Sequence, residues 1–200
     1  EPTSRVKLTE ASDHPPVVHG KYRGRIETVR LADGKYVAIN IVPMEAYLAG
    51  VLAKELYGSW DAAAYRAQAI AARTFALYTL ETTAAARDKP WDVSDDEGSQ
   101  VYGGIAGETA KSRAAVNATR GQVLVFVRDG QPGIFCARYS ACSGGASQDP
   151  ADAWNDSTVP PLAGRILGPV DDNCPNYTWP TMRVSKTDIT RCVRSWGQRN

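Results

Sequence analysis

Histidine is scarce in this chain of 200 residues. There are two, His14 and His19, and both lie in a proline-containing stretch near the N-terminus. A Ser-His-Asp triad depends on a central histidine, and a multi-histidine metal site needs several of them close together. Any such site would have to be built from these two residues alone. We therefore expect a chemistry that does not use histidine.

A long hydrophobic run and a strong net charge are also missing. No apolar segment approaches the roughly 18–20 residues that a membrane-spanning helix needs. The net charge of +1 disfavours a broadly basic surface for nucleic acids. Hydrophobic residues make up 43% of the chain, which is enough for a real core. Because the sequence begins at Glu1 rather than methionine, we expect a processed or trimmed chain.

The cysteines do not form a CxxC pair, which disfavours a zinc ribbon or a thioredoxin-type motif. An even number of cysteines without this motif indicates two disulfides and an oxidising compartment. The alternative is four buried thiols, because cysteine is among the most often buried residue types. The four residues are Cys136, Cys142, Cys174 and Cys192.

The first half of the chain predicts strands followed by two helices. Residues 1–20 show weak periodicity, and we interpret them as an N-terminal arm or an edge strand. Residues 21–42 alternate around an Asp-Gly pair, which is typical of a hairpin. Pro43 can open a helix that runs to about residue 56. A second helix is expected over 61–87, and its alanine-rich, largely apolar surface favours a buried position.

The second half mixes irregular segments with shorter elements. The expected elements are a helix (108–119), two strands joined as a hairpin (within 122–140), a short strand (178–185) and a helix (187–196). Ser185 or Thr187 can cap the last helix. We therefore expect an α+β fold with β-hairpins and an antiparallel sheet around the long buried helix. Residues 21–200 are expected to form one domain with an active-site cleft.

One acidic residue lies on the apolar face of the first predicted helix. At about 100° per residue, Leu48, Val51 and Leu52 form an apolar stripe, and Glu55 projects into its middle, whereas Lys54 points away. A buried carboxyl group without a cation has a raised pKa. Glu55 is therefore a candidate general acid near neutral pH. The alternative is that the helix ends one turn early and Glu55 reaches solvent or pairs with an arginine.

The second predicted helix carries two polar residues, Gln68 and Arg73, on an otherwise apolar surface. Their polar ends are expected to reach a partner, a site or the surface. As candidates, both are assigned to substrate binding. The alternative is an arginine that extends to solvent and a glutamine that bonds a loop carbonyl.

Two glycine-containing loops offer groups that suit a sugar. The segment SQVYGG provides Gln100 and Tyr102, and the segment YSACSGGAS follows directly from a predicted strand. Aromatic faces can meet the apolar faces of sugar rings, and hydroxyl groups can meet hydroxyl groups. The alternative is two ordinary turns. The candidate substrate-binding residues of the second loop are Tyr139, Ser140, Ser143, Gly144 and Gly145.

Five segments occur in a fixed order: YRGRIETVRLADGKYVAINIVPMEAYLAGVLAKEL, AYRAQAIAARTFAL, SQVYGG, AVNATRGQVL and YSACSGGAS. Together they resemble the SpoIID domain (stage II sporulation protein D), which LytB-type amidase enhancers share. The resemblance runs from about Tyr22 to Trp179. It covers most of the chain.

The resemblance implies a lytic transglycosylase that acts on peptidoglycan. The catalytic glutamate of the family lies in a VxxEM-like motif that falls on Glu55. In the implied reaction Glu55 protonates the glycosidic oxygen between N-acetylmuramic acid and N-acetylglucosamine. The C6 hydroxyl of the same sugar then captures the oxocarbenium-like centre, and a 1,6-anhydro product forms. Ordinary glycosidases use two carboxylates, but here Asp95, Asp96 and Glu97 are expected to form a solvated acidic loop.

The chain departs from the family just before SQVYGG. Many sporulation-type members carry a zinc-binding Cys/His cluster there, whereas this chain has neither residue type in that stretch. The resemblance therefore implies no metal site and no cofactor, although the acidic residues could hold a hard cation such as calcium. Disulfides could stabilise the fold instead. Sequence proximity favours Cys136–Cys142 with Cys174–Cys192, and four cysteines allow three pairings.

The resemblance leaves three functions open. The first is the lytic transglycosylase, the second is a non-catalytic peptidoglycan-binding domain that recruits or stimulates an amidase, and the third is a hydrolase in which water replaces the C6 hydroxyl. The expected partners are peptidoglycan glycan strands, including strands stripped of stem peptides, and, for the second function, a cell-wall amidase. An extracytoplasmic location follows, either secreted, periplasmic or associated with the cell envelope.

Overall fold

The computed structural model describes residues 2–86, 89–140, 142–155, 159–174, 177–178 and 183–197. Two compact units divide the chain. The first comprises Glu1–Ala141 with Thr158–Leu162, and the second comprises Cys142–Ser157 with Ala163–Asn200. Residues 21–200, which the sequence predicted to form a single domain, are therefore distributed over both units. Helices and strands are mixed, which confirms the α+β class.

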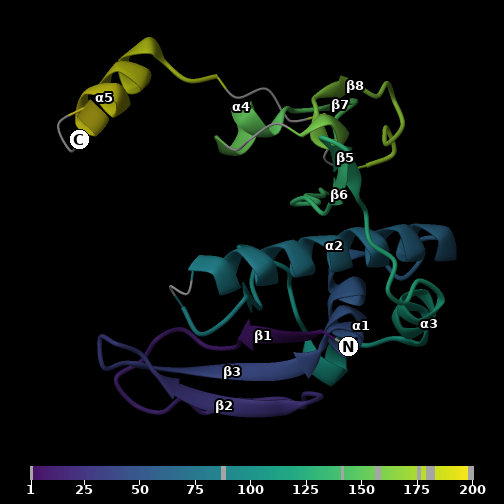
Figure 1. The fold of residues 1–200 in the computed structure, drawn as a ribbon. Coiled ribbons are helices and arrows are strands. Elements are labelled where there is room, and N and C mark those ends of the chain that lie inside the picture. The colour runs from purple at the N-terminus through teal and green to yellow at the C-terminus, as the bar shows by residue number, and fades with distance from the viewer. Residues whose placement is uncertain are drawn as a thin grey trace. The chain divides into compact units, whose positions relative to one another are not determined.

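The first unit is built on a four-stranded sheet with the order β2-β3-β1-β4. The strands are β1 (Thr3–Lys7), β2 (Arg25–Arg30), β3 (Tyr36–Pro43) and β4 (Val93–Ser94). β3 pairs antiparallel with both β1 and β2, and the short β4 pairs parallel with β1. Figure 1 shows these strands on one side of the first unit and the long helix α2 (Ala62–Ala86) on the other, with α1 (Met44–Glu55) between them.

The strand β1 has a neighbour on each side, where the sequence predicted an arm or an edge strand. Alternate side chains of β1 are buried, with Ser4 at 2% and Val6 at 0% exposure. Only one of these two buried residues is hydrophobic. The period of two that marks a strand was therefore too weak to identify an inner strand from the sequence.

The predicted first hairpin is confirmed by the pairing of β2 with β3. Its turn contains Gly34 with φ +88°, a backbone conformation that glycine adopts without steric cost. Asp33 supports the turn because its carboxylate accepts a hydrogen bond from the Lys35 amide at 3.0 Å. The second predicted hairpin is present in shorter form, as β5 (Phe126–Arg128) and β6 (Gln131–Gly133). The strand predicted over 133–140 is wrong beyond Gly133, because residues 134–140 form no strand.

The helices α1, α2 and α3 (Ala110–Ala118) pack together and carry much of the hydrophobic core. α1 begins directly after Pro43, as predicted. One close approach positions the candidate site. A Cβ atom on Gly50 of α1 would lie 2.7 Å from the Tyr102 ring and 2.8 Å from the Gly104 carbonyl oxygen. Glycine at this position therefore lets the 100–104 segment pack directly on α1.

The second unit holds shorter elements. They are β7 (Ala146–Ser147), β8 (Arg165–Ile166), α4 (Pro150–Trp154) and α5 (Lys186–Gly197). Ser185 caps α5, because its hydroxyl oxygen accepts a hydrogen bond from the Asp188 amide at 3.1 Å. Much of the strand predicted over 178–185 lies outside the described residues. Among the described helices of both units, none combines the length and the apolar character that crossing a membrane requires.

Candidate active site

Glu55 is the last residue of α1, and its carboxylate meets the segment that follows β4. Its Oε1 accepts a hydrogen bond from the Val101 amide at 3.0 Å. Leu48, Val51 and Leu52 of the same helix are fully buried. The side chain of Glu55 is half-buried, whereas Lys54 is exposed. The helical position inferred from the sequence is therefore confirmed, and its catalytic role remains a prediction.

Burial raises the pKa of Glu55, and the hydrogen bond from Val101 opposes part of this rise. Within the described residues, no lysine or arginine forms an ion pair with Glu55. Its place at the carboxyl end of α1 also disfavours negative charge, because the last carbonyl groups of a helix carry partial negative charge. Both effects make Glu55 easier to protonate than an ordinary glutamate, which is the direction that a general acid requires.

A chain of polar side chains lies beside Glu55. The hydroxyl of Tyr47, on α1, donates to Gln100 Oε1 at 3.0 Å. Gln100 Nε2 donates to the Tyr139 hydroxyl oxygen at 3.0 Å and to the Ala72 carbonyl at 3.3 Å. Burial raises the pKa of Tyr139 to about 12, and the nearby charge of Glu55 contributes to this rise. Tyr139 therefore keeps its proton, and its hydroxyl can donate a hydrogen bond to a ligand.

Gln68 lies on α2 next to Tyr139 and lowers the pKa of that hydroxyl. Its Nε2 atom is buried and forms no hydrogen bond of good geometry with the described residues. A buried amide without an acceptor is costly, typically about 1–3 kcal/mol. A ligand oxygen or water at this position would remove that cost. The structure therefore brings together Glu55, Gln68, Gln100 and Tyr139 from the predicted set.

Gln100 differs from its prediction in one respect. Its side chain is only 1% exposed, and its amide is occupied by Tyr47, Ala72 and Tyr139. It therefore orients Tyr139 and does not present its own amide to a sugar.

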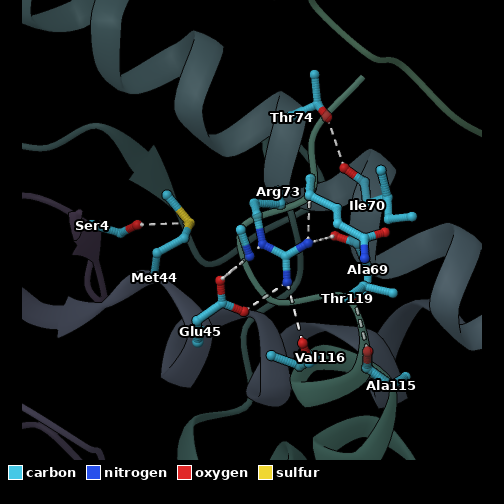
Figure 2. A network of polar contacts seen from close by, with 12 residues as sticks. Ser4, Met44, Glu45, Ala69, Ile70, Arg73, Thr74, Ala115, Val116 and Thr119 are labelled. Carbon is cyan, nitrogen blue, oxygen red and sulfur yellow. Dashed lines mark hydrogen bonds and ion pairs between the residues drawn. The ribbon is translucent and has the colours of Figure 1, made fainter. Parts of the chain in front are cut away.

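The prediction that Arg73 binds substrate is wrong. Its side chain is 1% exposed, and two of its nitrogens donate to Glu45 at 3.0 and 2.6 Å. Nη1 donates to the Gln122 carbonyl at 2.9 Å. Figure 2 shows the guanidinium group at the centre of this network, with Glu45 and Val116 around it. Arg73 joins α1, α2 and the end of α3 in the core.

Tyr102 is also a core residue and not a sugar-stacking surface. It is 5% exposed, and its hydroxyl donates to Asn40 Oδ1 at 3.0 Å. Its ring packs against those of Tyr22 and Tyr47, with centroid distances of 5.9 and 5.1 Å. The sequence pattern predicted an accessible loop. In the structure the Tyr102 ring packs on α1, because Gly50 has no side chain that would occupy the space of the ring.

The remaining predicted loop residues are divided between the two units. Ser140 is exposed in the first unit. Ser143, Gly144 and Gly145 belong to the second unit. There the Ser143 amide donates to the Asp171 carboxylate, and the Gly145 amide donates to Ser143 Oγ at 3.2 Å. The sugar-binding role of these four residues stays a prediction.

The structure does not form the disulfides that sequence proximity favoured. All four cysteines carry thiols, so neither Cys136–Cys142 nor Cys174–Cys192 is bonded. The thiol of Cys142 instead makes a hydrogen bond with that of Cys174, which raises the pKa of Cys142 to about 11. Contact between segments distant in sequence, and not proximity along the chain, determines which cysteines are neighbours.

The segment before Gln100 does not fit the zinc cluster of sporulation-type members. Ser94 Oγ donates to Asp96 Oδ1 at 2.7 Å and lies in hydrogen-bond contact with Ser99 Oγ at 3.2 Å. These hydroxyls are weak zinc ligands compared with thiolate or imidazole. Across the described ranges, no three His, Cys, Asp or Glu side chains gather to hold a metal ion.

Asp95 differs from the solvated loop residue that the sequence predicted. It is half-buried, whereas Asp96 and Glu97 are exposed. Burial raises the pKa of Asp95 to about 6. Asp95 and Glu55 both raise the pKa of Tyr47, but neither carboxylate shifts the pKa of the other. They are therefore not a coupled pair.

Two functional candidates were missed by sequence reasoning. Tyr47 was not singled out in the sequence, although it carries the hydroxyl that orients Gln100. The turn after Glu55 presents Tyr57 and Trp60, which are 69% and 38% exposed and lie edge to face at 6.0 Å. Lys111 fixes this turn by donating to the Gly58 and Trp60 carbonyls at 2.6 and 2.8 Å. Two aromatic residues within five positions of a candidate acid were the available signal.

Comparison with known proteins agrees with the resemblance. Residues 32–126 match the family described as Stage II sporulation protein, SpoIID. An amidase enhancer of Bacillus subtilis (strain 168) is 32% identical over 142 residues, which cover 71% of this chain and 17% of that protein. Stage II sporulation protein D of the same organism is 30% identical over 152 residues, covering 70% of this chain and 43% of that protein.

The chain spans less than half the length of either of these relatives. The matched region contains Glu55, Gln68 and Gln100, which are the first three members of the cluster around the candidate acid. Through residues 32–126 the chain belongs to the SpoIID family, and over a longer stretch it is similar to an amidase enhancer and to stage II sporulation protein D.

Proposed function

We propose that this chain is a peptidoglycan lytic transglycosylase in which Glu55 acts alone as general acid and then general base. One observation carries the proposal. Glu55 is a half-buried carboxyl group at the carboxyl end of a helix, without a cationic partner among the described residues, and burial raises its pKa. Burying such a group costs stability unless it has a use.

The reaction needs one proton donor that later accepts a proton. Protonated Glu55 gives its proton to the glycosidic oxygen as the bond from C1 of N-acetylmuramic acid to that oxygen breaks. The C6 hydroxyl oxygen of the same sugar then bonds to C1, and its proton passes to Glu55. The products are a 1,6-anhydro end and a free N-acetylglucosamine hydroxyl. Glu55 is regenerated in its protonated form.

The surrounding groups suit a carbohydrate ligand. Gln68 offers a buried amide without a good acceptor among the described residues. Tyr139 offers a hydroxyl whose oxygen is already held by Gln100. Tyr57 and Trp60 offer exposed aromatic faces on a fixed turn, and aromatic rings pack well against apolar sugar faces. The raised pKa of Glu55 predicts that cleavage slows as pH rises past that pKa.

Digestion of purified glycan strands tests the proposal. Intact and peptide-free strands are incubated with the wild type, with Glu55→Gln, and with Glu81→Gln, which alters an exposed glutamate on α2. We expect Glu81→Gln to cleave like the wild type and Glu55→Gln to lose about 100-fold or more of the rate, as is typical for a general acid. Cleavage by Glu55→Gln at the wild-type rate would contradict the assignment.

A second candidate function is a glycan-binding domain that stimulates an amidase. The name of the amidase enhancer relative favours it. On this reading, the wild type would bind glycan strands without cutting them, and the rate of an added amidase would rise. Glu55→Gln would leave that rise unchanged. In both cases we propose an extracytoplasmic location, where peptidoglycan is accessible.

A further inference from the structure

A second concave site lies in the first unit, away from Glu55. It is a cavity of about 390 Å³ between α1 and α3. We call it the arginine pocket. Its lining residues on α1 are Glu45, Ala46 and Ala49, which lie six to ten residues before Glu55, or roughly 9–15 Å along a helix. Its lining residues are Arg23, Pro43, Glu45, Ala46, Ala49, Glu108, Arg113, Val116, Asn117 and Arg120.

The pocket carries more positive than negative charge. Three arginines line it, together with two glutamates. One of these glutamates, Glu45, already forms a two-pronged ion pair with the buried Arg73. The other, Glu108, is shared by Arg23, at 2.6 and 3.0 Å, and Arg113, at 3.5 Å. The carboxylates therefore neutralise only part of the guanidinium charge.

Two arginines in the pocket retain unused donors. Arg23 bonds Glu108 through Nε and Nη2, and Arg113 bonds it through Nη1. The Nη1 group of Arg23, and the Nε and Nη2 groups of Arg113, have no hydrogen-bond partner within the described ranges. The two side chains are 49% and 50% exposed. A ligand can therefore reach these donors from solvent.

Glu108 sets the positions of both arginines. Its side chain is only 2% exposed, and the hydrogen bond from Arg23 lowers its pKa. Glu108 therefore stays ionised and holds the two guanidinium groups at the pocket.

We propose that the arginine pocket binds an oxyanion, either a carboxylate or a phosphate group. Guanidinium groups are suited to both, because their planar donors match pairs of oxyanion oxygens. Asn117 adds a polar side chain at the rim. The ligand forms no bond to Glu55 and needs no cleavage chemistry. The proposal therefore stands whether or not the chain is a transglycosylase.

Titration by calorimetry and by backbone NMR at low salt tests the pocket. Inorganic phosphate and N-acetylalanine are the probes, and N-acetylalanine amide is the uncharged control. We expect saturable binding of a charged probe, with shifts in the amides of residues 45–46 and 113–117. A preference for phosphate would indicate a phosphate-bearing ligand, and a preference for N-acetylalanine a peptide carboxylate. No saturable binding of either probe would overturn the proposal.

Variants separate the pocket from general surface charge. Arg113→Gln should weaken probe binding by about tenfold, and Ala46→Glu, which adds a negative charge to the cavity, should abolish it. Arg66→Gln removes an exposed arginine of α2 outside the pocket and should leave binding unchanged. Equal effects of Arg113→Gln and Arg66→Gln would contradict the assignment. Glu55→Gln should bind the probes like the wild type, so this test is independent of glycan cleavage.

Discussion

The carboxylate of Glu55 and the backbone amide of Val101 are joined by a hydrogen bond of 3.0 Å. This bond links the last residue of α1 to the segment that carries Gln100. It favours the ionised carboxylate, but burial outweighs it, so the pKa of Glu55 is raised. Burial raises the pKa of this carboxyl group and the hydrogen bond lowers it, so both its protonated and its ionised form are accessible to an acid-base cycle.

Tyr139→Phe tests the polar chain beside Glu55. The change removes the hydroxyl that accepts from Gln100 and retains the ring. We expect glycan cleavage to fall by about fivefold, because a lost hydrogen bond typically costs about 1 kcal/mol. Tyr78→Phe on α2 is the matched control and should cleave at the wild-type rate. Equal rates for wild type and Tyr139→Phe would remove Tyr139 from the site.

Arg73→Met tests the structural role of Arg73. The variant leaves Glu45 buried without its main cation, so we expect a loss of about 3–5 kcal/mol in the free energy of unfolding. Pairing it with Glu45→Gln should recover part of this loss, because the uncompensated charge is removed. Urea unfolding of the single and double variants measures both effects. If Arg73→Met unfolded like the wild type, the ion pair would contribute nothing to stability.

Asp95 makes the stability of the first unit depend on pH. Its pKa is about 6 in the folded state and 3.8 as an ordinary aspartate. Between these values the folded state binds the extra proton, so stability falls as pH rises through this range. Asp95→Asn should reduce the fall measured by urea unfolding at a series of pH values, and the part that remains is expected from Glu55 and Asp92, whose pKa values burial also raises. Asp96, whose pKa is lowered by a hydrogen bond from Ser94, provides the opposite control, since its contribution is lost as pH falls.

Cys142 and Cys174 are the pair that we expect to form a disulfide, because their thiols already share a hydrogen bond. Oxidised glutathione would accept two electrons as the two thiols release their protons and the sulfurs join. We expect non-reducing peptide mapping to link these two residues, with a stabilisation of the second unit by about 3–4 kcal/mol. Cys192→Ser should form the same link. A map that joins Cys136 to Cys142 would contradict this prediction.

The sequence was most informative where local periodicity decides the structure. Glu55 was found because its burial depends on helical spacing within α1, and Ser185 because a cap acts over three residues. Arg73 was misjudged because its partner Glu45 lies 28 positions away, and both were brought together by packing of α1 on α2. Cys142 and Cys174 became neighbours through an irregular segment that has no period to detect.

The same limit applies to Tyr102 and Gln100. Both were predicted to offer polar groups to a sugar from a glycine-containing loop. The burial of Tyr102 depends on Gly50, a residue of another element that allows the 100–104 segment to approach α1. Long-range contacts of this kind leave no pattern in the segment itself.

The most direct test of the central claim is mass spectrometry of the ends that the wild type leaves on purified glycan strands. A lytic transglycosylase with Glu55 as its single acid and base produces 1,6-anhydro ends, and Glu55→Gln produces none. Reducing ends in the wild-type digest would indicate that water replaces the C6 hydroxyl. Strands that remain uncut by the wild type would contradict the enzymatic account altogether.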